Sequence, residues 1–291
     1  MLILADDHLK KEKNKIMGQY LATVRPRIDT AIATAYAQHD LLFDWHRFEI
    51  PSGEACIKNF NIIMPGTNGS AGNAVDFVFF IARSVNGAAP PSLGTANAAA
   101  NGAAAKIAFA GAKNHIVYTQ VVDADIMQSP STYTQSYNIY TSTTMNTIGG
   151  TQAAQVANAL QPGGVNIGNS TYPGNYNNST SQPGMQSFWI AAITNGAHDF
   201  GTAIALNQAG DQAAVALSTT SETTLTIDGT DADDVLSVGD ELIAADGAKI
   251  GKVTAIVDAD NFKVDHVEEA LEDDDEICVR NPIIFNFGIE Y

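Results

Sequence analysis

Three short acidic runs are the part of this sequence whose residue types and spacing could bind a cation. They are DGTDADD at 228–234, DADN at 258–261 and EDDDE at 272–276. Ca²⁺ takes carboxylate oxygens, but none of the runs has the D-x-[DN]-x-[DN]-G spacing and later Glu of an EF-hand loop. Aspartate also caps tight turns and keeps short edge strands from pairing with other chains. The sequence favours this architectural role, with calcium binding as the alternative.

No motif of a common enzyme class is complete, since NGSAG around Ser70 lacks the first glycine of the nucleophile elbow G-x-S-x-G. GAKIGK at 247–252 has the wrong spacing for a phosphate-binding loop and is followed by Val253 instead of Ser or Thr. The six histidines are His8, His39, His46, His115, His198 and His266. They show no metal-binding spacing, and the adjacency of His198 and Asp199 does not define a geometry. We therefore predict no catalytic residue, no metal and no cofactor, and a protein that is not an enzyme.

The chain is acidic, and its charge is unevenly distributed. The formal net charge is −17 over 291 residues. Residues 221–291 contain 19 of the 32 acidic residues and 4 basic ones, whereas residues 1–60 contain 8 of each. The positive stripe that binds phosphate groups is missing, so we predict no direct contact with nucleic acid and none with an anionic membrane.

The stretch 126–197 contains no Asp, Glu, Lys or Arg. About a quarter of residues are charged on average, so a solvated stretch of this length would carry charges. Burying an unpaired charge costs free energy, and tyrosine is enriched at protein interfaces. We therefore predict a protein-contact surface with Tyr137, Tyr140, Tyr172 and Tyr176 as contact residues. The alternative is a sugar-binding loop, in which Tyr172, Tyr176 and neighbouring asparagines hold a glycan.

Residues 1–40 are predicted to form a helical arm. One helix is expected over 8–23 and a second over 28–38, separated by Pro26, which disfavours a continuous helix. The apolar stripe expected on the first helix consists of Ile16, Tyr20 and Val24. Because this stripe is too narrow for a self-sufficient core, these three residues are candidate contacts. The partner surface is either the arm's own domain or a neighbouring subunit.

Targeting segments and cysteine spacing give no further indication of function. The N-terminal residues carry charges where a signal peptide needs an apolar stretch, so no secretion signal is predicted. No apolar run approaches 18 residues, so no membrane-spanning helix is predicted. Cys56 and Cys278 form no C-x-x-C motif and are interpreted as free thiols.

Residues 41–218 are predicted to form a β-sandwich domain with long uncharged loops. The expected strands lie at 41–51, 54–63, 74–83, 114–127, 131–144, 186–195 and 201–208. VDFVFFIA, within the third of these, is nearly all apolar, which is typical of a strand covered on both faces. Strict alternation along the first strand would place Phe43 and Phe48 on opposite faces.

Residues 219–281 are predicted to form a small acidic β module of the SH3-like or small-barrel kind, because short strands follow one another closely between Asp-rich turns. The alternating segment NPIIFNFGIEY at 282–291 is expected to return to the sandwich as a strand. The predicted fold class is therefore mainly β: an N-terminal helical arm, a jelly-roll-like sandwich and a small C-terminal module.

The stretch TTLTIDGTDADDVLSVGDELIAADGAKIGKVTAIVDADNF at 223–262 resembles β modules that recur in structural proteins of tailed bacteriophages. The shared features are an L-x-V-G-D-x-L strand, an Asp-Gly hairpin and a G-x-V-T-A-I return strand. The section IPSGEACIKNFNIIMPG…VDFVFFIARS…PPSLGTANAAANG is similar, more loosely, to phage jelly-roll proteins of the capsid-decoration type. Neither family carries catalytic residues that could be transferred to this chain.

These resemblances imply a virion structural protein, assembled in the host cytoplasm. The expected role is capsid decoration (cement), in which the protein binds and stabilises the major capsid lattice. The implied partners are the major capsid protein and copies of the chain itself, with a trimer among the candidate symmetries of the homo-oligomer. A tail, neck or fibre component with a receptor- or glycan-binding loop is the alternative, and an enzyme of unrecognised type is the third class.

Overall fold

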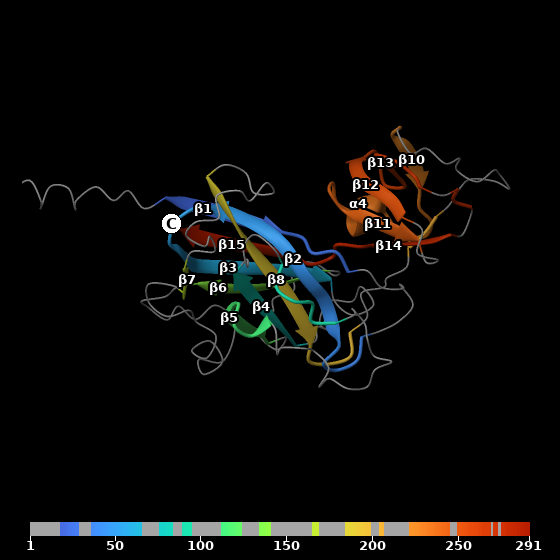
Figure 1. Cartoon of the computed structure of the whole chain (residues 1–291). Helices are drawn as coiled ribbons and strands as arrows, with labels where there is room; N and C mark the ends of the chain where they lie inside the picture. The colour runs from blue at the N-terminus through green and yellow to red at the C-terminus, as the bar shows by residue number, and fades with distance from the viewer. Residues whose placement is uncertain are drawn as a thin grey trace, which may run out of the picture.

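The computed structural model places two groups of strands side by side (Figure 1). The residues it describes are 18–28, 36–65, 76–83, 89–94, 112–123, 134–140, 165–168, 184–198, 204–206, 221–244, 249–268, 270–272 and 275–291. These ranges contain fifteen strands and one complete short helix, α4 (Ala232–Val235), so the described chain is mainly β, as predicted. Within the same ranges no helix has the length and apolar character needed to cross a membrane.

The first sheet contains both the first and the last of the described strands. Its antiparallel order is β1-β15-β3-β6, and β7 also pairs with β3. The strands are β1 (Gln19–Val24), β15 (Ile284–Glu290), β3 (Ala55–Pro65), β6 (Thr134–Tyr140) and β7 (Val165–Gly168). The C-terminal strand therefore lies inside the sheet, between two strands from the first quarter of the chain (Figure 1).

The second sheet has the antiparallel order β2-β8-β4-β5. Its strands are β2 (Leu41–Pro51), β8 (Met185–Thr194), β4 (Phe77–Arg83) and β5 (Ile116–Val122). The register of β2 against β8 shifts twice, between Leu41 and Phe43 and between Phe43 and His46. These irregularities break the alternation, so the expectation that Phe43 and Phe48 face opposite sides is wrong and both lie in one core.

Phenylalanine side chains join the two sheets. The ring centroid of Phe285, on β15, lies 5.4 Å from that of Phe79 on β4. The ring of Phe287, also on β15, lies 5.8 Å from that of Phe48 on β2. Such rings dominate the energetics of a core because each buries a large apolar area. We call the two sheets and their shared core the sandwich.

The outer face of the second sheet is partly covered by residues 89–94. The indole N–H of Trp45 donates to the carbonyl of Pro91 at 3.0 Å, and the N–H of Leu93 donates to Asp44 Oδ1 at 3.0 Å. A small second core forms beneath this segment and contains Leu41, Leu93, Ala112 and Ala191. β4 has buried residues on both of its faces, which accounts for its nearly all-apolar sequence.

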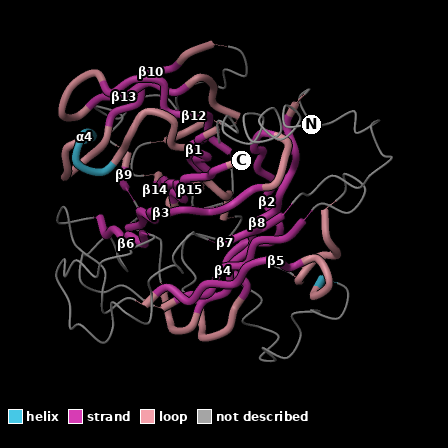
Figure 2. The backbone as a smooth tube through the Cα atoms, turned by 90° about the vertical axis from the view of Figure 1, so that its left-hand side faces the viewer, coloured by secondary structure: helices cyan, strands magenta, loops and turns pink. Residues whose placement is uncertain are grey.

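The remaining strands form a separate sheet, which we call the small β-unit. Its order is β10-β13-β12-β11-β14-β9, and it curls into a half-barrel (Figure 2). Its strands are β9 (Ile204–Ala205), β10 (Thr223–Thr226), β11 (Glu241–Ala244), β12 (Lys249–Ile256), β13 (Asn261–Val264) and β14 (Glu276–Val279). Apart from Phe262, its buried core residues are aliphatic.

The predicted N-terminal helix is wrong for residues 19–24, which form strand β1 in continuous register with β15. Ala22 and Val24 are buried, whereas Leu21 and Thr23 are exposed, so the period is two. The prediction failed because a spacing of four, as between Tyr20 and Val24, puts two residues on one face of either a strand or a helix. Residues 1–17 and 29–35, including Ile16, lie outside the described residues.

The small β-unit includes residues before the predicted boundary at 219. Ile204 pairs with Ile277, and Leu206 forms a bridge with Ile227. Residues 204–206 therefore belong to this sheet and not to the sandwich. Nothing in their composition marks the change of sheet, because the pairing partners lie far away in the sequence.

Candidate functional site

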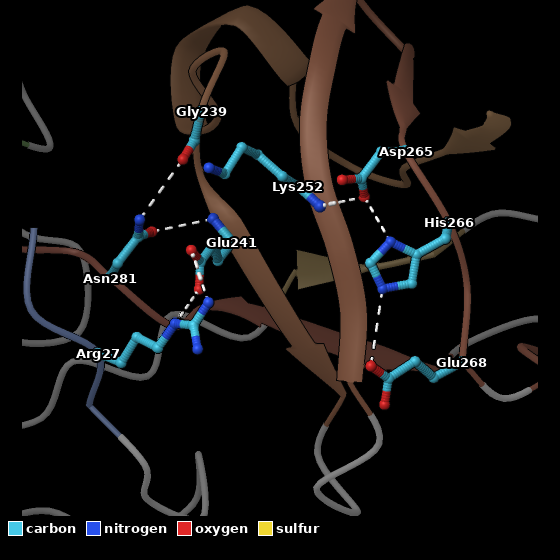
Figure 3. Close-up of polar contacts among 8 residues, drawn as sticks. All are labelled: Arg27, Gly239, Glu241, Lys252, Asp265, His266, Glu268 and Asn281. Atoms are coloured by element: carbon cyan, nitrogen blue, oxygen red, sulfur yellow. Dashed lines mark hydrogen bonds and ion pairs between the residues drawn. The ribbon is translucent and has the colours of Figure 1, made fainter. Parts of the chain in front are cut away.

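Two arginines that follow β1 connect the sandwich to the small β-unit. Arg25 Nη2 contacts Asp240 Oδ1. Arg27 donates to both carboxylate oxygens of Glu241, from Nε at 2.5 Å and from Nη2 at 3.1 Å (Figure 3). A planar guanidinium matches a carboxylate in this two-bond geometry, which fixes orientation as well as contact. We call the contact among residues 25–28, 239–242 and 280–281 the seam.

Backbone and amide hydrogen bonds complete the seam. The N–H of Ile28 donates to the carbonyl of Arg280 at 2.8 Å, and the N–H of Arg280 donates to that of Glu241 at 2.6 Å. Asn281, which is 3% exposed, accepts from the N–H of Glu241 at 2.9 Å and donates to the carbonyl of Gly239 at 3.4 Å (Figure 3). Three segments distant in sequence therefore hold one another in place.

The V-G-D part of the L-x-V-G-D-x-L motif builds the turn that presents the carboxylates. Gly239 has a φ of 96°, a conformation that favours glycine. Asp240 Oδ2 accepts from the N–H of Ser237 at 2.8 Å. The N–H of Gly239 donates to the carbonyl of Val253, and the N–H of Val253 donates to that of Asp240, both at 2.8 Å. The geometry of this turn therefore explains why glycine and aspartate occupy positions 239 and 240.

Asp240 is the most buried carboxylate of the seam, with 5% of its surface exposed. Burial raises the pKa of Asp240, and the N–H of Ser237 and the charge of Arg25 both oppose this rise. Taking two charges out of water costs free energy that their attraction offsets only in good geometry. The seam is therefore suited to fixing one arrangement of the two units more than to adding stability.

Carboxylates in the acidic turns accept hydrogen bonds from backbone N–H groups of the same turn. Asp258 Oδ1 accepts from the N–H groups of Asp260 and Asn261 at 3.1 and 2.9 Å, and from Asn261 Nδ2 at 2.7 Å. The Asn261 side-chain bond is the main cause that lowers the pKa of Asp258. Asp275 Oδ2 accepts from the N–H of Glu272 at 2.6 Å. The predicted capping role is confirmed at these two turns, whereas Asp231 before α4 makes no side-chain cap bond.

His266 lies between two carboxylates on the small β-unit (Figure 3). Its Nδ1 is 2.7 Å from Asp265 Oδ1, and its Nε2 is 3.6 Å from Glu268 Oε1. Asp265 Oδ1 also accepts from the N–H of Lys252 at 2.7 Å. A Cβ at Gly251 would stand 1.9 Å from this oxygen, so the network requires a glycine there. Among the described residues, no group of three or more His, Cys, Asp or Glu could hold a metal ion.

His198 is the most buried histidine of the described chain, at 1% exposure. It forms a bridge with Tyr36, and burial lowers its pKa to about 4, so the ring is neutral at pH 7. Asp199, its neighbour in sequence, lies outside the described residues, as does Ser70. Residues 249–252 of the phosphate-loop-like run lie in strand β12 and pair with β11, which is not the strand-to-helix turn that phosphate binding needs. Cys56 and Cys278 are free thiols, as predicted.

The predicted contact residues fall into three groups. Val24 is 3% exposed and Tyr20 packs partly buried against the sandwich core, so both side chains contact their own chain. Tyr137 and Tyr140 lie on β6, opposite Ile62 and Asn59 of β3. The others, Ile16, Tyr172 and Tyr176, lie outside the described residues.

Sequence reasoning missed the seam arginines. Arg25 and Arg27 flank Pro26 just after β1, and their partners lie more than two hundred residues away. The one available signal was a pair of basic residues near the N-terminus together with the Asp-Glu doublet at 240–241. Without a known fold, no spacing rule links two such doublets.

A groove opens between the edge strands of the two sheets, β1 and β2. Its volume is about 280 Å³, and its lining includes Tyr20, Arg25, His46, Arg47 and Glu49. Arg47 contacts Glu49, and Arg25 contacts Asp240, so each lining arginine is paired with a carboxylate. Burial and then the charge of Arg27 lower the pKa of His46. The groove separates the two strands, which are not paired with each other.

No family model, curated protein or solved structure matches the chain. Function is therefore inferred from the seam, the capped turns and the edge strands. In the seam and the capped turns, the polar groups hold backbone or join the two units. These contacts fix the two units relative to each other.

Proposed function

We propose that this chain is a non-enzymatic structural protein of a tailed-bacteriophage virion, and that it acts as a capsid decoration (cement) protein. In this role it binds the major capsid protein and copies of itself, after assembly in the host cytoplasm. The sandwich would be the jelly-roll-like domain and the small β-unit the SH3-like module. The chain takes no cofactor and does not contact nucleic acid directly.

The observation that carries the proposal is the use of the L-x-V-G-D-x-L motif. Gly239 forms the turn, Asp240 caps it and pairs with Arg25, and Glu241 pairs with Arg27. The motif through which the chain resembles phage virion modules thus serves to fix one β-unit on another. A protein that bridges lattice positions needs such a fixed arrangement, because a loose connection would lose binding free energy to ordering.

The charge distribution also supports a place on the outer surface of a particle. The acidic residues are concentrated in the small β-unit, and Figure 1 shows this unit projecting from one side of the sandwich. Like charge disfavours contact with packaged nucleic acid. The uncharged stretch 126–197 includes β8, a central strand of the second sheet whose side chains are mostly buried in the sandwich. The part of the stretch that precedes β8 would form the capsid-facing contact.

One observation favours the alternative, a tail, neck or fibre protein that binds a glycan. An uncharged polar row crosses the outer face of the first sheet, where Thr23 Oγ1 donates to Asn286 Oδ1 at 2.8 Å and Asn286 Nδ2 donates to Asn61 Oδ1 at 3.3 Å. Asn138 of β6 stands next in register, opposite Asn61. Asparagine is depleted in strands, so such a row suggests a polar ligand with hydroxyl groups.

The test is incorporation of a charged variant into particles. Asn175→Lys with Asn178→Glu lies in the uncharged stretch, outside the described residues, and should reduce attachment to capsids while leaving the isolated fold intact. Thr224→Lys with Val257→Glu, at exposed positions of the small β-unit, is the matched control and should incorporate normally.

Copy number gives the second measurement. Quantification in purified particles should find hundreds of copies of the wild-type chain if it decorates the capsid. A few to dozens of copies, or normal incorporation of Asn175→Lys with Asn178→Glu together with lost adsorption to host cells, would replace decoration by the fibre role.

A further inference from the structure

β1 is an edge strand whose outward side is unpaired within the described strands, because it pairs only with β15. Gly18 and Tyr291 exchange both backbone hydrogen bonds, at 3.0 and 3.1 Å. In an antiparallel pair, residues that bond to the partner alternate with residues that bond outward. The residues whose N–H and C=O groups point to the free edge are Gln19, Leu21 and Thr23.

This edge lacks the features that prevent strand addition. β1 has the sequence QYLATV, with no charge, no proline and no register shift against β15. The edge strand across the groove differs, because β2 carries Asp44, Arg47 and Glu49 and has two register shifts against β8. Natural proteins blunt edges with charges and bulges of this kind. A regular, uncharged edge is competent to pair with another strand.

Leu21 marks the centre of this edge. Its side chain is 64% exposed, the highest value among the large hydrophobic residues described. It stands on the outer face of the sheet, between the exposed side chains of Gln19 and Thr23. Exposed leucines are common singly, but this one coincides with unpaired backbone groups. The two features together point to a contact made along the strand.

The edge is complementary to itself. An antiparallel pairing centred on Leu21 places Leu21 opposite Leu21 of a second copy and Gln19 opposite Thr23 of that copy. All three positions have outward-pointing backbone groups, so both strands present donors and acceptors in matching places. On the core side, Tyr20 then faces the small side chain of Ala22 of the second copy, above the groove. A two-fold axis at Leu21 relates the copies and closes the assembly.

The charge distribution permits this arrangement despite the net charge of −17. The acidic small β-unit docks on Arg25 and Arg27, just beyond the C-terminal end of β1. Because the pairing is antiparallel, the two small β-units lie beyond opposite ends of the joined strands. Their mutual repulsion is therefore low, and the joined edge itself is uncharged.

We propose that two copies of the chain pair through β1, antiparallel and centred on Leu21, so that the first sheets of both sandwiches become one continuous sheet. The inference deepens the self-association part of the proposed function and rests on it. Its test uses the purified chain without particles, so a failure here leaves the capsid-attachment test unaffected.

The experiment is charge complementation at Leu21, followed by sedimentation velocity. The wild-type chain should be a dimer, and Leu21→Lys and Leu21→Glu alone should each raise the dimer dissociation constant by about tenfold or more, because like charges face each other. An equimolar mixture of the two variants should restore dimers. Val121→Lys, at a 48% exposed position of edge strand β5, is the control and should stay dimeric.

A covalent measurement fixes the register. In a Cys56→Ser background, Leu21→Cys should form an intermolecular disulfide under mild oxidation, because opposed residues of such a pair have Cα atoms about 5.5 Å apart. Gln19→Cys should not link to itself, since Thr23 would face it. A monomeric wild-type chain, an oligomer that Leu21→Lys leaves intact, or equal linking at both positions would each overturn the proposal.

Discussion

The sandwich and the small β-unit are both antiparallel, but they are built from residues at very different separations. In the sandwich, β1 pairs with β15, so Thr23 stands opposite Asn286. In the small β-unit, β12 pairs with the next strand, β13, across a short Asp-capped turn. The core of the sandwich is a cluster of phenylalanines, whereas Phe262 is the one buried phenylalanine among the described core residues of the small β-unit.

This difference has consequences for folding. Contacts between distant residues form slowly, because loop closure must precede the contact, whereas hairpins form quickly. The sandwich needs the last residues of the chain, since Phe285 and Phe287 lie at its centre. The small β-unit needs only residues 204–279. We therefore expect the small β-unit to fold first and the sandwich to be the unit most sensitive to changes at the C-terminus.

Phe287→Ala should have the largest effect. The ring of Phe287 contacts Phe48, Phe60 and Phe79 with centroids 5.8 to 6.1 Å apart, so its removal leaves a cavity between the sheets. The free energy of unfolding of the sandwich should fall by about 3–5 kcal/mol. Tryptophan fluorescence in urea measures this change, because both tryptophans, at 45 and 189, lie in the second sheet.

Phe262→Ala is the matched change in the small β-unit. It should leave the tryptophan transition in place and increase the rate at which a thiol reagent labels Cys278, which is buried in β14. A Cys56→Ser background makes the label specific. If each variant moved both probes equally, the two units would unfold as one and the comparison would fail.

Acid should weaken the sandwich through His198. Burial lowers the pKa of His198 to about 4 in the folded chain, from 6.5 in the unfolded chain. The unfolded chain therefore takes up a proton first as pH falls, so the stabilisation present above pH 6.5 is lost progressively down to pH 4. The total loss is about 3 kcal/mol. Urea titrations followed by tryptophan fluorescence at several pH values measure the slope.

His198→Gln should flatten this pH dependence, although His46, whose pKa burial also lowers, retains a smaller effect in the same direction. The small β-unit serves as the internal reference, because His198 and His46 both lie in the sandwich. If the free energy of unfolding of the wild-type sandwich did not change between pH 7 and 4.5, the lowered pKa of His198 would be contradicted.

The separation of contacting residues along the chain also determines which features could be predicted from the sequence. Strand 41–51 was predictable from its own residues, although the register shifts that place Phe43 and Phe48 in one core were not. β1 was not, because Tyr20 and Val24 fit a helix as well as a strand until β15 supplies the backbone partner. The capped turn at Asp258 was predictable, since all its partners lie within three residues. The seam was not, because its contacts join distant segments.

Asp240→Ala should have an intermediate effect. It removes the cap on Ser237 and leaves Arg25, whose side chain is 23% exposed, without the carboxylate it contacts. The stability of the small β-unit should fall by about 2–3 kcal/mol. Labelling of Cys278 measures the loss. Asp240→Asn keeps an acceptor for the cap and should cost about half as much. Equal costs for both would show that the charge, and not the cap, dominates.

The smallest effect is expected at the other half of the seam. Arg27 is 52% exposed and Glu241 19% exposed on their side chains, and solvent screens such a pair. A double-mutant cycle with Arg27→Ala and Glu241→Ala should give a coupling energy of about 0.5 kcal/mol, which falls further at high salt. Lys58 and Glu290, 3.3 Å apart within the sandwich, form the control pair and should give a similar value.

Although its coupling energy is small, the ion pair between Arg27 and Glu241 should matter for geometry, because Arg27→Lys keeps the charge but loses the two-bond fit. Residual dipolar couplings should then show a wider spread of orientations between the two units at unchanged stability. A coupling energy several times larger would mean that the seam holds the units together energetically, and the sandwich and the small β-unit would have to be treated as one cooperative body.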